Sequence, residues 1–172
     1  MSPSPVRCRP VGRCFALSIT LAILVCLLAT ARAGARPMPQ FSLTAARGGQ
    51  PVDSSAYCGR VLLVNFFATW CAPCRQEVPS LLALEQEYGR KGFSVIGICL
   101  GTDDRKSVAE FMDKLKITYP VAMADEAVLD GFGGVVAVPV TFLIGRNGEI
   151  LERFFGLVDP GTLTRAIEQA LQ

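Results

Sequence analysis

The segment from Val61 to Cys74 constrains the fold more than any other part of the chain. The near-continuous apolar run Val61–Phe67 predicts a strand that is buried on both faces, as in the centre of a parallel sheet. Cys71 and Cys74 follow at once, and the residues after them have the apolar spacing of a helix. Cys71 is therefore expected at a helix N-terminus, where backbone N–H groups and the helix dipole favour a thiolate. Because the thiolate is the form that attacks disulfides, this placement predicts thiol–disulfide exchange.

Composition indicates a packed globular domain and excludes several kinds of chemistry. The chain has 172 residues, of which 51% are hydrophobic and 19% charged, which suits one domain plus a targeting segment. It has no histidine, so catalysis by a histidine base and histidine metal sites are excluded. Four of the 17 basic residues lie in the first 33 positions. The rest of the chain has 13 basic and 15 acidic residues, so its charges nearly balance. With no basic patch, a nucleic-acid partner is not expected.

The N-terminus has the pattern of an export signal. Residues 1–33 combine a positive region with an apolar stretch at 15–29 and small residues ending at Ala33. Such a segment is typical of a cleaved signal peptide, and an uncleaved membrane anchor is the alternative. Residues 34–40 contain two prolines and predict a linker, which leaves 41–172 as the folded domain. Both alternatives place the domain outside the cytoplasm.

Four cysteines fall in the domain, at Cys58, Cys71, Cys74 and Cys99. A bond between Cys71 and Cys74 closes too short a loop to be a useful structural staple. If their strands are parallel, Cys58 and Cys99 lie about 20 Å apart, well beyond the reach of about 7 Å for a disulfide. Cys99 is expected to be a small buried side chain, with an auxiliary thiol as the alternative. A zinc site needs about four ligands, so no metal site is expected.

The rest of the domain predicts strands that alternate with helices, which is the pattern of an α/β domain with a mixed sheet. In its first half we expect a hairpin from 41–44 and 51–53, a helical turn at 54–57 and a strand at 93–98. A helix capped within 102–104 and a short helix at 127–132 follow. The domain should end with a hairpin from 140–144 and 150–155 around Asn147-Gly148 and a last helix after Asp159-Pro160.

Two segments resemble one known family. Residues 64–79, which contain Trp70-Cys71-Ala72-Pro73-Cys74, are similar to the active-site segment of the TlpA/ResA-like branch of the thioredoxin superfamily. A second match covers 138–144 and the Asn147-Gly148 turn, and the resemblance spans about 40–172. It implies a thioredoxin fold, with a central mixed β-sheet flanked by helices and an N-terminal β-hairpin extension.

The family pattern assigns roles to the dithiol segment. Cys71 would attack a substrate disulfide, and Cys74 would resolve the mixed disulfide. Ala72 and Pro73, between the two cysteines, would tune the reduction potential. The Cys71–Cys74 disulfide is the only redox group expected, with no separate cofactor.

Three further residues are expected to form the substrate site. Trp70 would be a lid beside the dithiol, and the alternative is a packing residue. Pro139 resembles the cis-proline that faces the dithiol in this superfamily, and the alternative is a trans-proline at the start of a strand. Val138 would then offer its backbone to an extended substrate peptide.

Glu77 follows Cys74 by three residues and would lie one helical turn further on. In the resembling branch an acid at this position lies near the dithiol, where it can raise a thiol pKa and exchange a proton with the second sulfur. The alternative is a solvated helix acid. Asn65 stands where thioredoxin has a buried aspartate, which makes Glu77 the better candidate for proton handling.

The sequence therefore predicts an extracytoplasmic thiol–disulfide oxidoreductase, a monomer that acts as a reductant. The resemblance implies a disulfide-containing protein substrate, such as apocytochrome c or a copper-site protein, and a membrane electron donor of the DsbD/CcdA type. The alternatives are a peroxiredoxin-type peroxidase and a non-catalytic binding or chaperone-like module.

Overall fold

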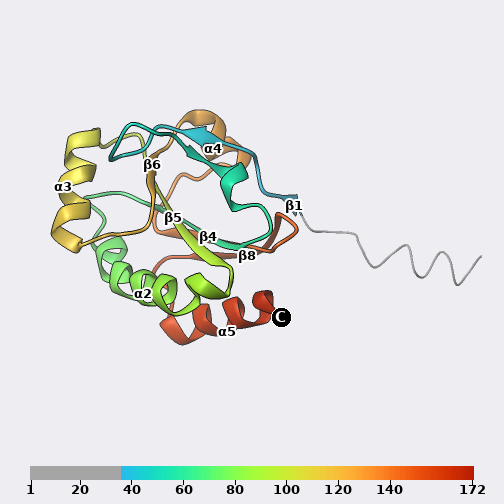
Figure 1. The fold of residues 1–172 in the computed structure, drawn as a ribbon. Helices are drawn as coiled ribbons and strands as arrows, with labels where there is room; N and C mark the ends of the chain where they lie inside the picture. The colour runs from blue at the N-terminus through green and yellow to red at the C-terminus, as the bar shows by residue number, and fades with distance from the viewer. Residues whose placement is uncertain (1–35) are drawn as a thin grey trace, which may run out of the picture. The chain divides into compact units, whose positions relative to one another are not determined.

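The computed structural model of the protein describes residues 36–172. Its centre is a six-stranded sheet with the strand order β1-β8-β7-β4-β5-β6 (Figure 1). β4, β5 and β6 run parallel, whereas β7 is antiparallel to β4 and β8 is antiparallel to β7, so the sheet is mixed as expected. The strands are β1 (Arg36–Pro37), β4 (Val61–Phe67), β5 (Phe93–Cys99), β6 (Val121–Met123), β7 (Val140–Ile144) and β8 (Glu149–Phe155).

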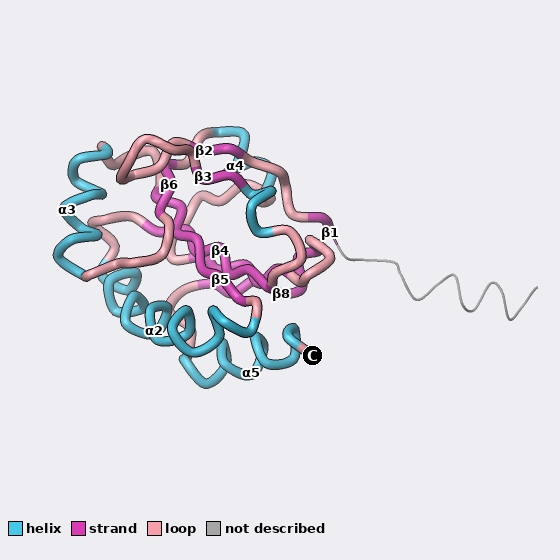
Figure 2. The backbone as a smooth tube through the Cα atoms, viewed as in Figure 1, coloured by secondary structure: helices cyan, strands magenta, loops and turns pink. Residues whose placement is uncertain are grey.

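Helices cover both faces of this sheet (Figure 2). They are α2 (Ala72–Tyr88), α3 (Arg105–Leu115), α4 (Glu126–Gly131) and α5 (Pro160–Leu171). Buried side chains of α2, α3 and α5 belong to one core cluster, and α4 contributes to the other. Aspartates cap α3, α4 and α5 by accepting a backbone N–H in the first turn, at Asp104, Asp125 and Asp159. Within residues 36–172, no helix has both the length and the hydropathy that crossing a membrane requires.

The predicted elements lie where the pattern placed them, with two exceptions. β6 was not predicted, because its three residues are too few to show a strand period. The linker expected at 34–40 is wrong for the part that the structure describes, since Arg36–Pro37 forms β1 and pairs with β8. Proline is tolerated there because β1 is an edge strand. The signal peptide or anchor expected in residues 1–33 lies outside the described residues.

The expected N-terminal hairpin is formed by β2 (Ser42–Leu43) and β3 (Val52–Asp53), which pair antiparallel. Its connecting loop lies along β6. Ala46 donates its backbone N–H to the carbonyl of Val121 at 2.8 Å, and Met123 donates to Thr44 at 2.9 Å. The hairpin extension therefore covers the edge strand of the sheet, where unpaired backbone groups would otherwise be exposed.

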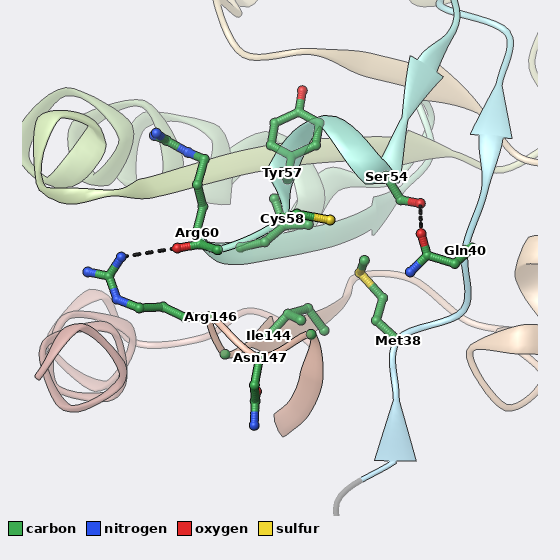
Figure 3. Close-up of a pocket in the computed structure, with 13 residues that line it drawn as sticks. Met38, Gln40, Ser54, Tyr57, Cys58, Arg60, Ile144, Arg146 and Asn147 are labelled. Carbon is green, nitrogen blue, oxygen red and sulfur yellow. Dashed lines mark hydrogen bonds between the residues drawn. The ribbon is translucent and has the colours of Figure 1, made fainter.

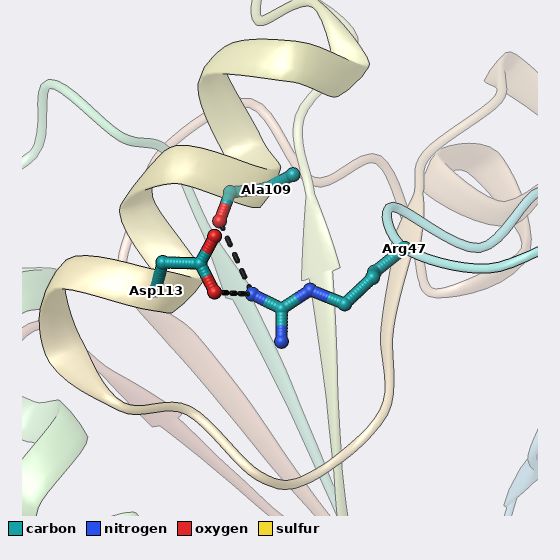
Figure 4. Close-up of polar contacts among 3 residues, drawn as sticks. All are labelled: Arg47, Ala109 and Asp113. Carbon is teal, nitrogen blue, oxygen red and sulfur yellow. Dashed lines mark hydrogen bonds and ion pairs between the residues drawn. The ribbon is translucent and has the colours of Figure 1, made fainter.

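Arg47 joins this loop to α3 (Figure 4). Its guanidinium donates to the carboxylate of Asp113 and to the carbonyl of Ala109, the latter at 3.3 Å. Both charged side chains are largely exposed, so the ion pair itself adds little stability. The contact orients the loop on the helix more than it strengthens the fold.

Candidate active site

The two active-site cysteines lie where β4 passes into α2. Cys71 is the N-cap of α2, and its Sγ accepts a hydrogen bond from the backbone N–H of Cys74 at 3.2 Å. The two residues form a disulfide with their Cα atoms 5.3 Å apart, and both are buried. On reduction the same N–H and the start of the helix face the sulfur of Cys71 and stabilise its thiolate. This geometry is the one that an attacking thiol at Cys71 and a resolving thiol at Cys74, inside the helix, would require.

Trp70 stands in solvent next to the disulfide. Its side chain is 62% exposed, and within residues 36–172 its indole N–H makes only a long contact of 3.5 Å to the hydroxyl of Thr102. A packing tryptophan would be buried, so the structure does not fit that alternative. An exposed ring beside the dithiol can contact a bound substrate.

Pro139 is buried, and the peptide bond that joins it to Val138 is cis. Its carbonyl accepts a hydrogen bond from the backbone N–H of Gly156 at 2.8 Å. Val138 packs against the core cluster to which Cys71 and Cys74 belong. Its own N–H and carbonyl make no hydrogen bond with any residue in 36–172. These backbone groups are therefore free to pair with an extended peptide.

Glu77 is buried, with 1% of its surface exposed, and is not the solvated helix acid considered from sequence. Its Oε2 accepts a hydrogen bond from the amide of Asn65 at 2.9 Å, and that amide also donates to the hydroxyl of Thr141 at 2.9 Å. Oε1 has no hydrogen-bond partner among the described residues. Burial raises the pKa of Glu77, while the Asn65 amide and the nearby backbone N–H of Val158 act against that rise.

Glu77 and Cys74 lie on the same face of α2. They are three residues apart in the helix, and both side chains are buried, which places them one above the other. A carboxyl group with a raised pKa in this position can hold or accept a proton at neutral pH. It is a suitable acceptor for the proton that Cys74 must lose before it attacks.

Two contributors to the site were not predicted from sequence. Thr141 precedes Phe142 in a strand pattern and gives no sign that its hydroxyl is buried and accepts a hydrogen bond from Asn65. Asp103 was expected only as a possible helix cap, but its carboxylate binds Thr69, two residues before Cys71. Both depend on contacts between distant parts of the chain, which no local pattern shows.

Within residues 36–172, the other two cysteines, Cys58 and Cys99, form no disulfide and lie at opposite ends of the parallel strands β4 and β5. Cys58 is exposed and lines a cavity of about 260 Å³ beside Met38 and Gln40, shown in Figure 3. This cavity lies next to the start of β4, whereas the dithiol follows its end. Cys99 is buried, and burial together with the Asp103 carboxylate raises the pKa of its thiol.

Metal binding is not suggested by this arrangement. Across residues 36–172, no three His, Cys, Asp or Glu side chains are grouped in a way that would hold a metal ion.

Fold and site together define a thioredoxin-fold dithiol oxidoreductase. The family model described as Redoxin matches residues 33–171, and the chain belongs to this family. It is 31% identical to the thiol-disulfide oxidoreductase ResA of Geobacillus kaustophilus over 140 residues, 81% of this chain and 79% of the relative. It is 32% identical to the thioredoxin-like protein YneN of Bacillus subtilis over 136 residues, 77% of this chain and 75% of the relative.

A solved structure supports the same conclusion. A thiol:disulfide interchange protein of the thioredoxin family from Chlorobium tepidum superposes with a TM-score of 0.75 at 31% identity, over 83% of this chain and 100% of that chain. With the disulfide between Cys71 and Cys74, these relatives identify the protein as a thiol–disulfide oxidoreductase of the ResA type. The predicted fold class, family and enzyme class are confirmed.

Proposed function

We propose that this protein is an extracytoplasmic reductant of protein disulfides. The observation that carries the proposal is the buried Glu77 on the same helix face as Cys74, with one oxygen unpaired. A carboxylate near a thiol disfavours the thiolate and therefore the reduced form of the dithiol. A dithiol whose reduced form is disfavoured gives up its electrons readily, which suits a reductant.

The reaction needs only the two thiols, a proton acceptor and no cofactor. The Cys71 thiolate attacks one sulfur of the substrate disulfide, forms a mixed disulfide and expels the other substrate sulfur as a thiolate. Cys74 then gives its proton to Glu77 and attacks the sulfur of Cys71. The second substrate thiolate leaves, two electrons have passed to the substrate, and Cys71 and Cys74 end as a disulfide.

Substrate binding would use the surface next to the dithiol. The free backbone groups of Val138 would pair with an extended segment beside the substrate cysteine, and Trp70 would cover it from the other side. Such a site accepts an unfolded or flexible chain, as the cysteines of apocytochrome c or of a copper-site protein would present. A monomer, held outside the cytoplasm by residues 1–33 or released there, would receive electrons from a membrane donor of the DsbD/CcdA type.

Trapping with Cys74→Ala tests the proposed function. This variant keeps the attacking thiol but cannot resolve the mixed disulfide, so its natural partner should accumulate on Cys71. Full-length protein is expressed with Cys58→Ala as background, because Cys58 is an exposed free thiol within residues 36–172. Partners are identified after non-reducing separation, and proteins with a cysteine pair for haem or copper binding are expected.

Cys71→Ala in the same background is the matched control and should trap nothing. Partners captured equally by both variants would contradict the proposal, and so would full activity of Cys71→Ala in cells, which a non-catalytic module would show. The direction of electron flow is checked by redox equilibration with glutathione. A reduction potential of about −120 mV, the value of a strong oxidant, would contradict a reducing role.

A further inference from the structure

A second carboxylate, that of Asp103, contacts the segment that leads into Cys71. Its Oδ2 accepts a hydrogen bond from the backbone N–H of Thr69 at 2.8 Å, and its Oδ1 accepts one from the hydroxyl of the same residue at 2.9 Å. The thiol of Cys99 donates to Oδ2 at 3.4 Å. One half-buried side chain thus joins the end of β5 to the loop between β4 and α2.

Local structure brings Asp103 to this position. β5 ends beside β4, where Leu100 donates its backbone N–H to the carbonyl of Phe67 at 2.9 Å. The chain then turns tightly, with Asp103 donating to the carbonyl of Leu100 at 3.3 Å, and returns over Cys99. The next residue, Asp104, caps α3 through the backbone N–H of Ser107. Asp103 is therefore not needed to begin the helix.

Cys99 serves Asp103 as a donor. Its thiol is fully buried, and burial and the neighbouring carboxylate both raise its pKa, so it keeps its proton at neutral pH. A protonated thiol is a poor nucleophile but can donate a hydrogen bond. This accounts for an unpaired cysteine close to a redox-active disulfide: it orients the carboxylate and does not compete with Cys71.

Thr69 is held by all its polar groups, whereas Trp70 is held by almost none. Besides its two bonds to Asp103, Thr69 accepts a hydrogen bond on its carbonyl from Arg75 at 2.8 Å. Trp70 is mostly exposed and has only the long contact to Thr102. The backbone on both sides of Trp70 is thus held, at Thr69 by these bonds and at Cys71 by its N–H to the carbonyl of Ala68 at 3.2 Å, and Thr69 contributes to the direction in which the indole leaves the backbone.

We propose that Asp103 is a positioning residue for thiol–disulfide exchange. It holds Thr69 from one side, with Cys99 fixing the carboxylate, so that Trp70 remains beside the dithiol in the place where a peptide substrate contacts it. This role differs from that of Glu77, which acts on the protons of the dithiol. It concerns the exchange reaction itself and is independent of the cellular substrate and of the direction of electron flow.

The test compares two disulfides as probes of reduced full-length Asp103→Ala, made in the Cys58→Ala background because Cys58 is an exposed thiol. One is a disulfide-linked peptide dimer, which must contact Trp70, and the other is the small aromatic disulfide DTNB, which needs only the thiolate. We expect the rate constant with the peptide to fall about tenfold, as the loss of hydrogen bonds to a charged group predicts, and that with DTNB to change less than about twofold. Since Trp70 is the only tryptophan, its fluorescence anisotropy should also fall.

Matched variants separate positioning from general destabilisation. Asp104→Ala removes the neighbouring helix cap and should lower the urea midpoint of unfolding, with both rates and the anisotropy unchanged. Cys99→Ala should slow the peptide reaction about twofold, and Cys99→Ser, which keeps a donor, should restore it. These variants keep the proposal testable if Asp103→Ala does not fold.

Three outcomes would overturn the proposal. The first is an unchanged peptide rate and anisotropy in Asp103→Ala. The second is an equal fall with both probes, which would assign the effect to the Cys71 thiolate. The third is failure of Cys99→Ser to differ from Cys99→Ala. None of these bears on whether the protein is a reductant outside the cytoplasm, which the trapping experiment decides.

Discussion

Both faces of the central strand β4 are mainly apolar, but only one of them contains a buried polar network. On one face, Asn65 lies between Thr141 on the neighbouring strand and Glu77 on α2, and all three side chains are buried and polar. On the other face, Phe66 packs with two aromatic rings, those of Phe132 at 5.1 Å and Phe142 at 5.8 Å between centroids. Successive residues of one strand thus point into a polar network and into an apolar cluster.

This difference separates what stabilises the fold from what the reaction requires. Buried aromatic rings contribute through apolar area and edge-to-face packing, without any polar group to satisfy. A buried carboxyl with an unpaired oxygen is costly and adds nothing to packing. Since the polar network lies on the face that α2 covers with the dithiol, we interpret its cost as the cost of placing a proton acceptor there.

The largest expected effect is loss of stability on the apolar face. Phe142→Ala removes a fully buried ring and leaves a cavity, which should lower the free energy of unfolding by about 3–5 kcal/mol in urea titrations. The exchange rate of the variant that remains folded should stay within about twofold of the parent, because the ring does not contact the dithiol side. A stability loss below about 1 kcal/mol would show that the cluster repacks and that this face is not the main source of stability.

An effect of opposite sign is expected on the polar face. Glu77→Gln keeps the shape of the side chain and the contact to Asn65 but removes the buried charge, so it should stabilise the domain at neutral pH by about 1–3 kcal/mol. In the folded protein the pKa of Glu77 lies above its ordinary value of 4.5. As the pH rises from 4.5 towards the folded-state pKa, the Glu77 carboxyl group loses its proton in the unfolded chain before it does so in the folded protein. The parent therefore loses stability as pH rises, while the glutamine variant does not titrate.

Urea titrations from below pH 4.5 to neutral pH check whether the stability of the parent falls as the pH rises. The difference between Glu77→Gln and the parent should disappear below the ordinary pKa of 4.5, where the carboxyl is protonated in both states. Exchange with the peptide disulfide should slow about tenfold, because Cys74 loses its proton acceptor. Glu110→Gln, at an exposed position on α3, is the control and should change neither quantity. A destabilised Glu77→Gln at neutral pH would contradict the cost assigned to the buried charge.

Sequence patterns could predict the elements of this fold but not their polar partners. The strand at Val61–Phe67 and the dithiol after it depend on local spacing, which the chain displays directly. The bond from Asn65 to Thr141 joins residues 76 apart, and it depends on the register of two strands. A local pattern gives neither the register nor the face on which a side chain finds a partner.

Asp103 and Asp104 show that even adjacent residues can have polar partners that the sequence does not predict. They are adjacent and chemically identical, and each could begin a helix by the rules of capping. Only the fold decides that Asp104 caps α3 while Asp103 binds Thr69, 34 residues earlier in the chain. Both aspartates fit the capping pattern in the sequence, and only the tertiary structure distinguishes the cap from the contact to Thr69.

The smallest expected effect is that of removing one hydroxyl from the polar face, and adding one to the other face is its counterpart. Thr141→Val removes the acceptor of one Asn65 N–H and should lower the free energy of unfolding by about 1 kcal/mol. Val64→Thr, in the same sheet but on the aromatic side, adds a hydroxyl to a fully buried apolar site and should cost about 1–3 kcal/mol. Thermal or urea unfolding of the two variants, and of the double variant, measures both.

The double variant makes the comparison of the faces decisive. Thr141 and Val64 lie on different faces of different strands and share no polar partner, so their effects should add within about 0.5 kcal/mol. If Val64→Thr cost no more than Thr141→Val, the surroundings of Val64 would already contain a group able to bind a new hydroxyl. If Thr141→Val cost nothing, Asn65 would be held by Glu77 alone, and the exchange rate should then depend on Asn65 but not on Thr141.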